Sequence, residues 1–189
     1  SYAPVVKRVA PAVVNVYAAK TVTNRNPLFD DPLFRRFFGG PDGPQVKRSL
    51  GSGVIVDPAG LVVTNHHVIE GADEVKVSLA DKREIAAEVV LRDARSDLAV
   101  LRLKENERFP AVELGDSDAL QVGDVVLALG NPFAVGQTVT HGIVSAVAGS
   151  PDMNTDYPFF IPTDAAINPG HSVGALVEPH GRLFEIKPR

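Results

Sequence analysis

Short runs of hydrophobic residues, separated by glycine and proline, recur along most of the chain. Residues 74–79 alternate apolar and polar side chains, which is the pattern of a strand with one buried face. Residues 52–57 and 61–64 flank a Pro-Ala-Gly sequence at 58–60, which predicts a hairpin turn. The other strands predicted in this half of the chain are residues 13–18, 84–92 and 98–103.

A second series of hydrophobic runs predicts strands at residues 124–130, 138–147, 159–163, 174–177 and 182–186. Only residues 3–9 and a turn near 67–70 are typical of helix. This pattern predicts an all-β fold, and the break near residues 104–111 predicts two barrels side by side. We expect residues 1–105 to hold the N-terminal segment and the first barrel, and residues 106–189 to hold the second.

Residues 23–49 interrupt the strand pattern. They are rich in proline, glycine and aromatic side chains and show no regular period. We therefore predict a long loop, and loops of this length in compact proteins are usually functional. We expect it to pack against a partner chain or a substrate.

Composition narrows the class of protein. The chain has 189 residues, of which 44% are hydrophobic, so a sizeable core can form. The net charge of −4 argues against binding to nucleic acid. Cysteine is absent, which excludes disulfides and thiolate chemistry. The five histidines include no His-Glu-x-x-His spacing, so we expect no metal site, and we expect no cofactor.

The apolar runs and the first residues of the chain indicate whether it could be inserted in a membrane or carry an export signal. No run approaches the roughly 18 apolar residues of a membrane span, so we expect membrane association only through an anchor outside this sequence. The first residues do not resemble a signal peptide. If the protein is exported, we expect this sequence to be a mature or trimmed form.

Three residues in a defined order are candidates for serine hydrolysis, a reaction that needs a nucleophile, a general base and an acid that fixes the tautomer of the base. His67 and Asp97 border strands of the predicted first barrel, and Ser172 precedes a strand of the second. The order His, Asp, Ser is that of the two-barrel serine proteases. Gly170, two residues before Ser172, strengthens the pattern.

The segment around Ser172 also spells Gly-x-Ser-x-Gly, the nucleophile motif of α/β-hydrolases. Those enzymes place their acid and histidine after the serine. Only 17 residues follow Ser172 here; they contain no aspartate, and His180 is their sole histidine. We therefore reject the α/β-hydrolase interpretation.

Over nearly its whole length the chain resembles the protease domain of the HtrA/Deg family. The matching segments are residues 10–16, 51–55, 64–69, 96–101, 114–117, 128–133, 136–140 and 163–170. The resemblance implies a chymotrypsin-like double six-stranded β-barrel, the trypsin-like serine protease fold. It also implies ATP-independent cleavage of unfolded or mislocalised proteins in quality control and the stress response, a trimer-based assembly, and a location in the bacterial periplasm.

The resemblance also implies roles for individual residues. His67 would be the general base, because the histidine of the family directly precedes valine, and Asp97 would orient it. Ser172 would attack the scissile carbonyl. An oxyanion hole would lie along the backbone of Gly170, His171 and Ser172. Substrate contacts would come from Ile167, Asn168 and Ile186, and Tyr2 would contribute to the trimer interface.

The chain departs from the family pattern mainly after residue 140. Val173 stands where the nucleophile motif has glycine, His141 where the family usually has serine, and Pro162 where glutamine is common. By strand count we expect the second barrel to be truncated, without its last strand, and we expect no PDZ domain within these 189 residues. If the replaced glycine has a positive φ, Val173 would distort the loop that carries Ser172.

Two functional hypotheses follow. The first is a serine endopeptidase that acts on unfolded polypeptides. The second is a catalytically inactive or latent protease-fold module that binds unfolded chains in a chaperone-like way. Val173 and the expected lack of the last strand motivate it. A family-like pocket near Ile167 and Ile186 would favour small or medium apolar side chains on the substrate.

Overall fold

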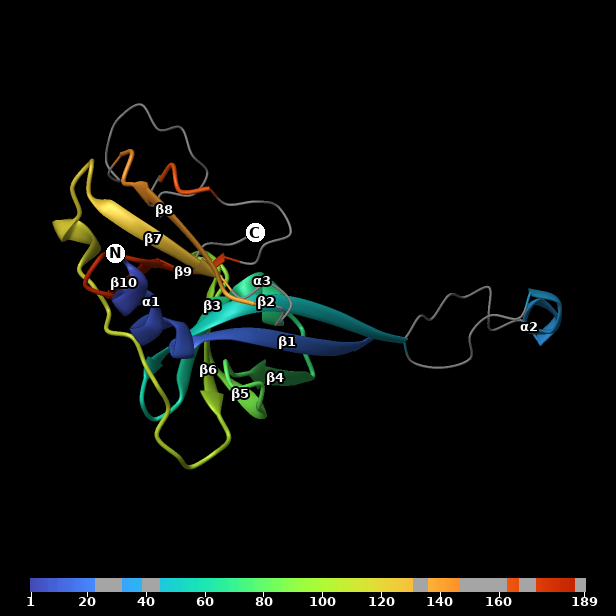
Figure 1. Ribbon diagram of the computed structural model, residues 1–189. Coiled ribbons are helices and arrows are strands. Elements are labelled where there is room, and N and C mark those ends of the chain that lie inside the picture. Colours follow the sequence, from blue (N-terminus) through green and yellow to red (C-terminus); the bar gives the residue numbers. More distant parts are fainter. Residues whose placement is uncertain (23–31, 39–44, 131–135, 147–162, 167–172, 186–189) are drawn as a thin grey trace.

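The computed structural model describes residues 1–22, 32–38, 45–130, 136–146, 163–166 and 173–185. Strands make up most of the secondary structure in these ranges, and they fall into two groups (Figure 1). The predicted all-β class is therefore confirmed. Where one folding unit ends and the next begins, near residue 105, stays a prediction.

The first group of strands closes into a barrel with the order β1-β2-β3-β6-β5-β4. Its strands are β1 (Val13–Val22), β2 (Gln45–Asp57), β3 (Leu61–Asn65), β4 (Glu74–Ser78), β5 (Glu84–Asp93) and β6 (Leu98–Leu103). All neighbours are antiparallel, and the predicted hairpin turn at residues 58–60 joins β2 to β3. All six strands predicted in this half of the chain are present.

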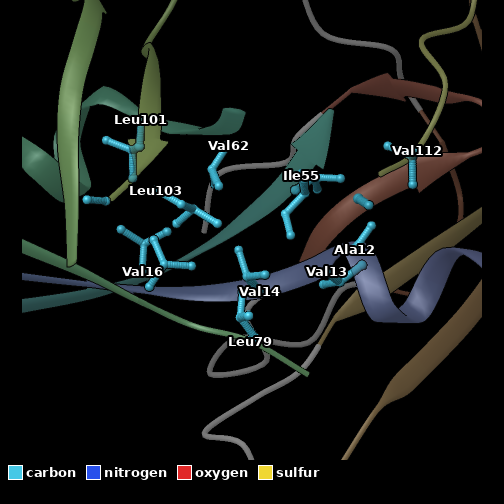
Figure 2. Packing of buried hydrophobic residues seen from close by; sticks show 14 of the residues in the cluster. Ala12, Val13, Val14, Val16, Ile55, Val62, Leu79, Leu101, Leu103 and Val112 are labelled. Carbon is cyan, nitrogen blue, oxygen red and sulfur yellow. The ribbon is translucent and has the colours of Figure 1, made fainter. Parts of the chain in front are cut away.

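The inside of the barrel is filled by branched aliphatic side chains, as the alternation of apolar residues predicts. Val14 and Val16 of β1 are fully buried, and so are Val62 of β3 and Leu101 of β6 (Figure 2). Burial of each such side chain contributes roughly 1.5–3 kcal/mol. The barrel is thus a packed core that can hold the loops at its rim in place.

The prediction of a loop over residues 23–49 is wrong at two places. Residues 32–38 form a short helix, α2 (Pro32–Phe38), and β2 begins at Gln45. β2 pairs with β1 in unbroken register as far as Val22↔Gln45, and together they form a ribbon that extends beyond the barrel (Figure 1). Residues 45–49 are exposed throughout, so the ribbon carries no alternation of apolar and polar residues to detect.

The second group of strands is a four-stranded antiparallel sheet with the order β10-β9-β7-β8. Its strands are β7 (Val125–Gly130), β8 (Thr138–Ile143), β9 (Val173–Val177) and β10 (Leu183–Glu185). β8 ends earlier than predicted because Val144 instead exchanges backbone hydrogen bonds with Gly123 and Asp124. Of the strand predicted at residues 159–163, only Thr163 is described, and it forms a bridge to Val144.

Four short helical segments complete the described part of the chain besides α2. They are α1 (Ala3–Val9), η1 (Ala10–Ala12), α3 (His66–Ile69) and η3 (Ser117–Ala119). The prediction of only two helical segments is wrong, because single turns such as η3 give no hydrophobic period. α1 agrees with its predicted bounds and has Pro4 in its first turn, where a missing backbone N–H costs no helical hydrogen bond. No helix among the described residues is long and apolar enough to cross a membrane.

The larger of the two buried hydrophobic clusters among the described residues extends across both sheets. Leu127, Leu129 and Val177 of the second sheet belong to the same buried cluster as the barrel interior. At the junction the backbones approach closely, since a Cβ atom on Gly174 of β9 would lie 3.2 Å from the Cβ of Ser52 in β2. The second sheet is therefore fixed on the outside of the barrel next to β2.

The turn between β9 and β10 is organised by one buried carboxylate. Glu178 is 7% exposed, and its Oε1 accepts a hydrogen bond from the backbone N–H of Arg182 at 3.0 Å. Its Oε2 lies 2.5 Å from His180 Nδ1. Burial raises the pKa of Glu178, but the hydrogen bonds from Arg182 and His180 outweigh that effect, and the net pKa lies below the ordinary value.

This depressed pKa predicts a pH-dependent contribution to stability. A carboxyl whose pKa is lower in the folded state stabilises the fold above its unfolded pKa, and the contribution is lost as the pH falls through the folded pKa. We expect Glu178→Gln to lower the free energy of unfolding by about 1–3 kcal/mol near pH 7 and by much less at acidic pH. Urea denaturation at several pH values measures the difference. Glu105→Gln, at an exposed glutamate, should show little effect at any pH, and an equal loss for Glu178→Gln at all pH values would contradict the prediction.

Candidate active site

The candidate site begins where two neighbouring strands of the barrel meet the surface. β3 ends at Asn65 and runs directly into the single turn of α3, which carries His67. β6 begins at Leu98, immediately after Asp97, and pairs with β3 through Asn65↔Leu98. Residues 30 positions apart in the sequence are therefore brought together by one strand pairing.

The structure places the imidazole of His67 against the carboxylate of Asp97. His67 Nδ1 lies 2.7 Å from Asp97 Oδ2, and the backbone N–H of His67 donates to Asp97 Oδ1 at 2.8 Å. The His67 side chain is 48% exposed and that of Asp97 is 26% exposed. A carboxylate in this position favours the tautomer with hydrogen on Nδ1, which leaves Nε2 as a proton acceptor.

Asp97 has an uncommon backbone conformation. Its φ of 54° lies in the left-handed region, where only Asp97 and Lys82 stand among the described non-glycine residues. Aspartate tolerates this region better than most residues, but the conformation still costs free energy, and such costs gather at functional sites. The backbone N–H of His66 donates to the Asp97 carbonyl at 2.9 Å, which links the turn to α3.

His67, and not its neighbour His66, contacts the carboxylate of Asp97. The family resemblance selects His67 over His66 for a different reason, namely that the histidine of the family directly precedes valine. The pairing is a geometric fact, whereas the catalytic roles of the two residues stay predictions.

The other residues predicted for catalysis, the oxyanion hole and substrate contact lie outside the described part of the chain. These are Ile167, Asn168, Gly170, His171, Ser172 and Ile186. The structure does describe the segments on either side of 167–172. Val173 begins β9, and its backbone pairs with that of Gly130.

The segment that leads into 167–172 is attached to β8. Asp164 Oδ1 accepts a hydrogen bond from the N–H of Ile143 at 2.7 Å, and the Thr140 hydroxyl donates to the carbonyl of Ala166 at 2.9 Å. Gly142 lies beneath this segment, and a Cβ atom there would overlap the backbone nitrogen of Ala165. The absence of a side chain at Gly142 thus allows the two backbones to touch.

Tyr2, the predicted interface residue, lies near the N-terminus of the chain, and its side chain is close to β8. Its ring centroid is 6.1 Å from that of His141 in β8.

No group of three or more potential metal ligands occurs among the described residues. A cavity of about 190 Å³ is lined by Arg8, Glu113, His180 and neighbouring residues, none of which belongs to the His67–Asp97 pair.

A closed barrel with a second sheet on its side and a His-Asp contact at its rim is the arrangement of trypsin-like peptidases. The trypsin-like peptidase domain family matches residues 51–184, and the chain belongs to this family. It is 44% identical over 201 residues to a probable periplasmic serine protease do/HhoA-like of Haemophilus influenzae, covering 98% of this chain and 43% of that one. It is 40% identical over 212 residues to the periplasmic serine endoprotease DegP of Escherichia coli K12, covering 98% and 44%.

Solved structures of the HtrA-type protease AlgW are similar as well. The form with a decapeptide has a TM-score of 0.73 at 52% identity, and the match covers 98% of this chain and 58% of the AlgW chain. The form with a tripeptide has a TM-score of 0.75 at 45% identity, and the match covers 98% of this chain and 53% of the AlgW chain. These findings confirm the predicted HtrA/Deg membership, the trypsin-like fold and the periplasmic location. The two curated relatives are named as serine proteases. The chain spans less than half the length of the curated relatives named here.

The close packing of Gly142 gives a prediction. In Gly142→Ala the new methyl group meets backbone atoms, which cannot move aside as a side chain can, so we expect a loss of about 1–3 kcal/mol in the free energy of unfolding. The amide of Ile143 should also exchange faster with solvent, because its acceptor Asp164 is displaced. Urea denaturation and NMR hydrogen exchange measure the two effects.

Gly174→Ala is the matched control, since its new Cβ would meet no atom closer than 3.2 Å. We expect it to be milder and to leave the exchange of Ile143 unchanged. If Gly142→Ala had the same free energy of unfolding and the same Ile143 amide exchange as the wild-type protein, the close backbone contact at Gly142 would be refuted.

Proposed function

We propose that the protein is a serine endopeptidase that cleaves unfolded or mislocalised polypeptides in the periplasm, with Ser172 as nucleophile, His67 as general base and Asp97 as the residue that orients His67. The observation that carries the proposal is the 2.7 Å contact between His67 Nδ1 and Asp97 Oδ2. In this arrangement the histidine presents Nε2, the nitrogen that must accept a proton.

The reaction would proceed in two halves. Ser172 Oγ attacks the scissile carbonyl while its proton passes to His67 Nε2, and His67 then gives that proton to the leaving amine. Water repeats the sequence on the acyl-enzyme and releases the acid. Backbone N–H groups from Gly170 to Ser172, the segment that includes His171, would stabilise the negative oxygen in both halves.

Polypeptide substrates are supported by the relatives. The names of DegP and of the Haemophilus protein describe proteases, and two AlgW structures contain peptides. We propose that Ile167, Asn168 and Ile186 contact the substrate and favour small or medium apolar side chains. The same comparisons favour cleavage over the alternative of an inactive module with chaperone-like binding.

The proposal predicts that Ser172 alone carries the nucleophilic activity. We expect a serine-reactive phosphonate to label Ser172 in the wild-type protein, as identified by mass spectrometry of the modified peptide. We expect Ser172→Ala to lower the rate of casein cleavage by about 10⁴-fold or more.

The control is Ser145→Ala, which alters an exposed serine of the second sheet region and should cleave casein at the wild-type rate. Wild-type protein that is neither labelled nor active would overturn the proposal. Wild-type protein that is inert yet suppresses the aggregation of unfolded clients would instead support the binding module.

We further propose that the protein assembles as a homotrimer through the surface around Tyr2. Tyr2 is 39% exposed although its ring lies beside His141 of β8. Val139 and Ile143, on the same strand, are 39% and 42% exposed. Burying this apolar surface, which water disfavours, would favour association.

This proposal predicts that Tyr2→Ala weakens the trimer. Removing the ring deletes apolar contact area from the centre of the surface, so we expect the dissociation constant of the assembly to rise at least about tenfold. Analytical ultracentrifugation over a range of concentrations measures it. Tyr17→Ala, at a tyrosine of β1 that is 37% exposed, is the matched control and should not change assembly. A monomeric wild type, or a trimer insensitive to Tyr2→Ala, would contradict the proposal.

A further inference from the structure

Asn65 lies between the strand β3 and the helix α3, and its side chain contacts Asp97. It is the last residue of β3, is only 6% exposed, and occupies the N-cap position of α3. Asparagine at an N-cap usually accepts a hydrogen bond from the first turn of the helix. Here the side chain makes no such bond; instead its Nδ2 donates to the backbone carbonyl of Asp97 at 3.2 Å.

This contact bears on the strained residue of the site. With φ at 54°, Asp97 has a conformation that its neighbours must stabilise. Its carbonyl accepts two hydrogen bonds, one from Asn65 Nδ2 and one from the backbone N–H of His66 at 2.9 Å. Both donors come from the end of β3, so the carbonyl is tied to the segment that carries the histidine.

The orientation of the carbonyl also sets the direction of the carboxylate. The carbonyl carbon and the Cβ atom of Asp97 are both bonded to its Cα. A change in the orientation of the carbonyl group would therefore move the carboxylate relative to α3. In the present conformation Oδ1 accepts from the His67 N–H at 2.8 Å, and Oδ2 contacts His67 Nδ1 at 2.7 Å. Asn65 therefore acts on His67 only through Asp97.

We infer that Asn65 is a positioning residue of the site: its carboxamide holds Asp97 in the left-handed conformation and thereby fixes the tautomer of His67. The inference rests on the proposed function for its catalytic meaning. A residue with a purely structural role would stabilise the barrel without contacting Asp97, and the adjacent Thr64 is an example. Thr64 is fully buried, and its hydroxyl donates to the carbonyl of Ser52 at 2.7 Å and not to the carbonyl of Asp97.

The test reads the tautomer of His67 directly. Neutral imidazole carries its hydrogen on Nδ1 or on Nε2, and the two forms differ in ¹⁵N chemical shifts. In ¹⁵N-histidine-labelled wild-type protein we expect neutral His67 to be the Nδ1–H tautomer. In Asn65→Ala we expect a substantial shift of the population toward Nε2–H. Peptide cleavage should fall about 10- to 100-fold, in kcat and not in KM, because alignment is lost while substrate contacts remain.

Thr64→Val is the matched control, since it removes a buried hydrogen bond one residue away. We expect it to lower the melting temperature without changing the tautomer of His67. If Asn65→Ala does not fold, Asn65→Ser serves, because its hydroxyl is too short to reach the Asp97 carbonyl.

An unchanged tautomer in a folded Asn65 variant would overturn the inference. The spectroscopic result does not depend on Ser172. A tautomer shift in a protein without peptidase activity would therefore support the role of Asn65 while contradicting the proposed function, and the two failures are distinguishable.

Discussion

The pairing of β3 with β6 is the constraint on which the candidate site depends. It runs in unbroken register from Leu61↔Arg102 to Asn65↔Leu98. A slip of one residue would turn every side chain of one strand to the opposite face, and both strands carry fully buried residues that forbid it. The barrel is closed, so both strands have a second neighbour that also fixes them. The register of a packed core thus decides that His67 and Asp97 meet.

The local conformation at Asp97 is unfavourable, and the surrounding hydrogen bonds offset it. A left-handed residue other than glycine costs about 1–2 kcal/mol. Against this stand two hydrogen bonds to the Asp97 carbonyl and two contacts with its carboxylate. Hydrogen bonds to charged groups contribute about 1.5–3 kcal/mol each, reduced here because the Asp97 side chain is 26% exposed. The balance favours the observed turn as long as the end of β3 supplies its donors.

The second sheet is placed by packing of a different kind. β9 follows directly on Ser172 in the sequence and touches the barrel at Gly174, beside Ser52 of β2. The carbonyl of Ser52 in turn accepts the hydroxyl of Thr64, the residue before Asn65. A continuous series of close contacts therefore runs from β9, the strand after the proposed nucleophile, to β3, the strand that leads into the helix of the proposed base. In a densely packed interior such contacts limit relative movement of the two sheets.

The sequence alone determined the all-β class, the strands of the barrel and the candidate residues His67 and Asp97, because alternating apolar residues and local motifs are properties of short segments. It did not determine the ribbon of β1 and β2 or helix α2, since exposed strands have no buried face and a single short helix has no detectable period. It assigned no role to Asn65. Only the tertiary structure, by pairing β3 with β6, turned that side chain toward a carbonyl 32 residues away. Interactions between distant segments depend on register and backbone conformation, which no short stretch of sequence contains.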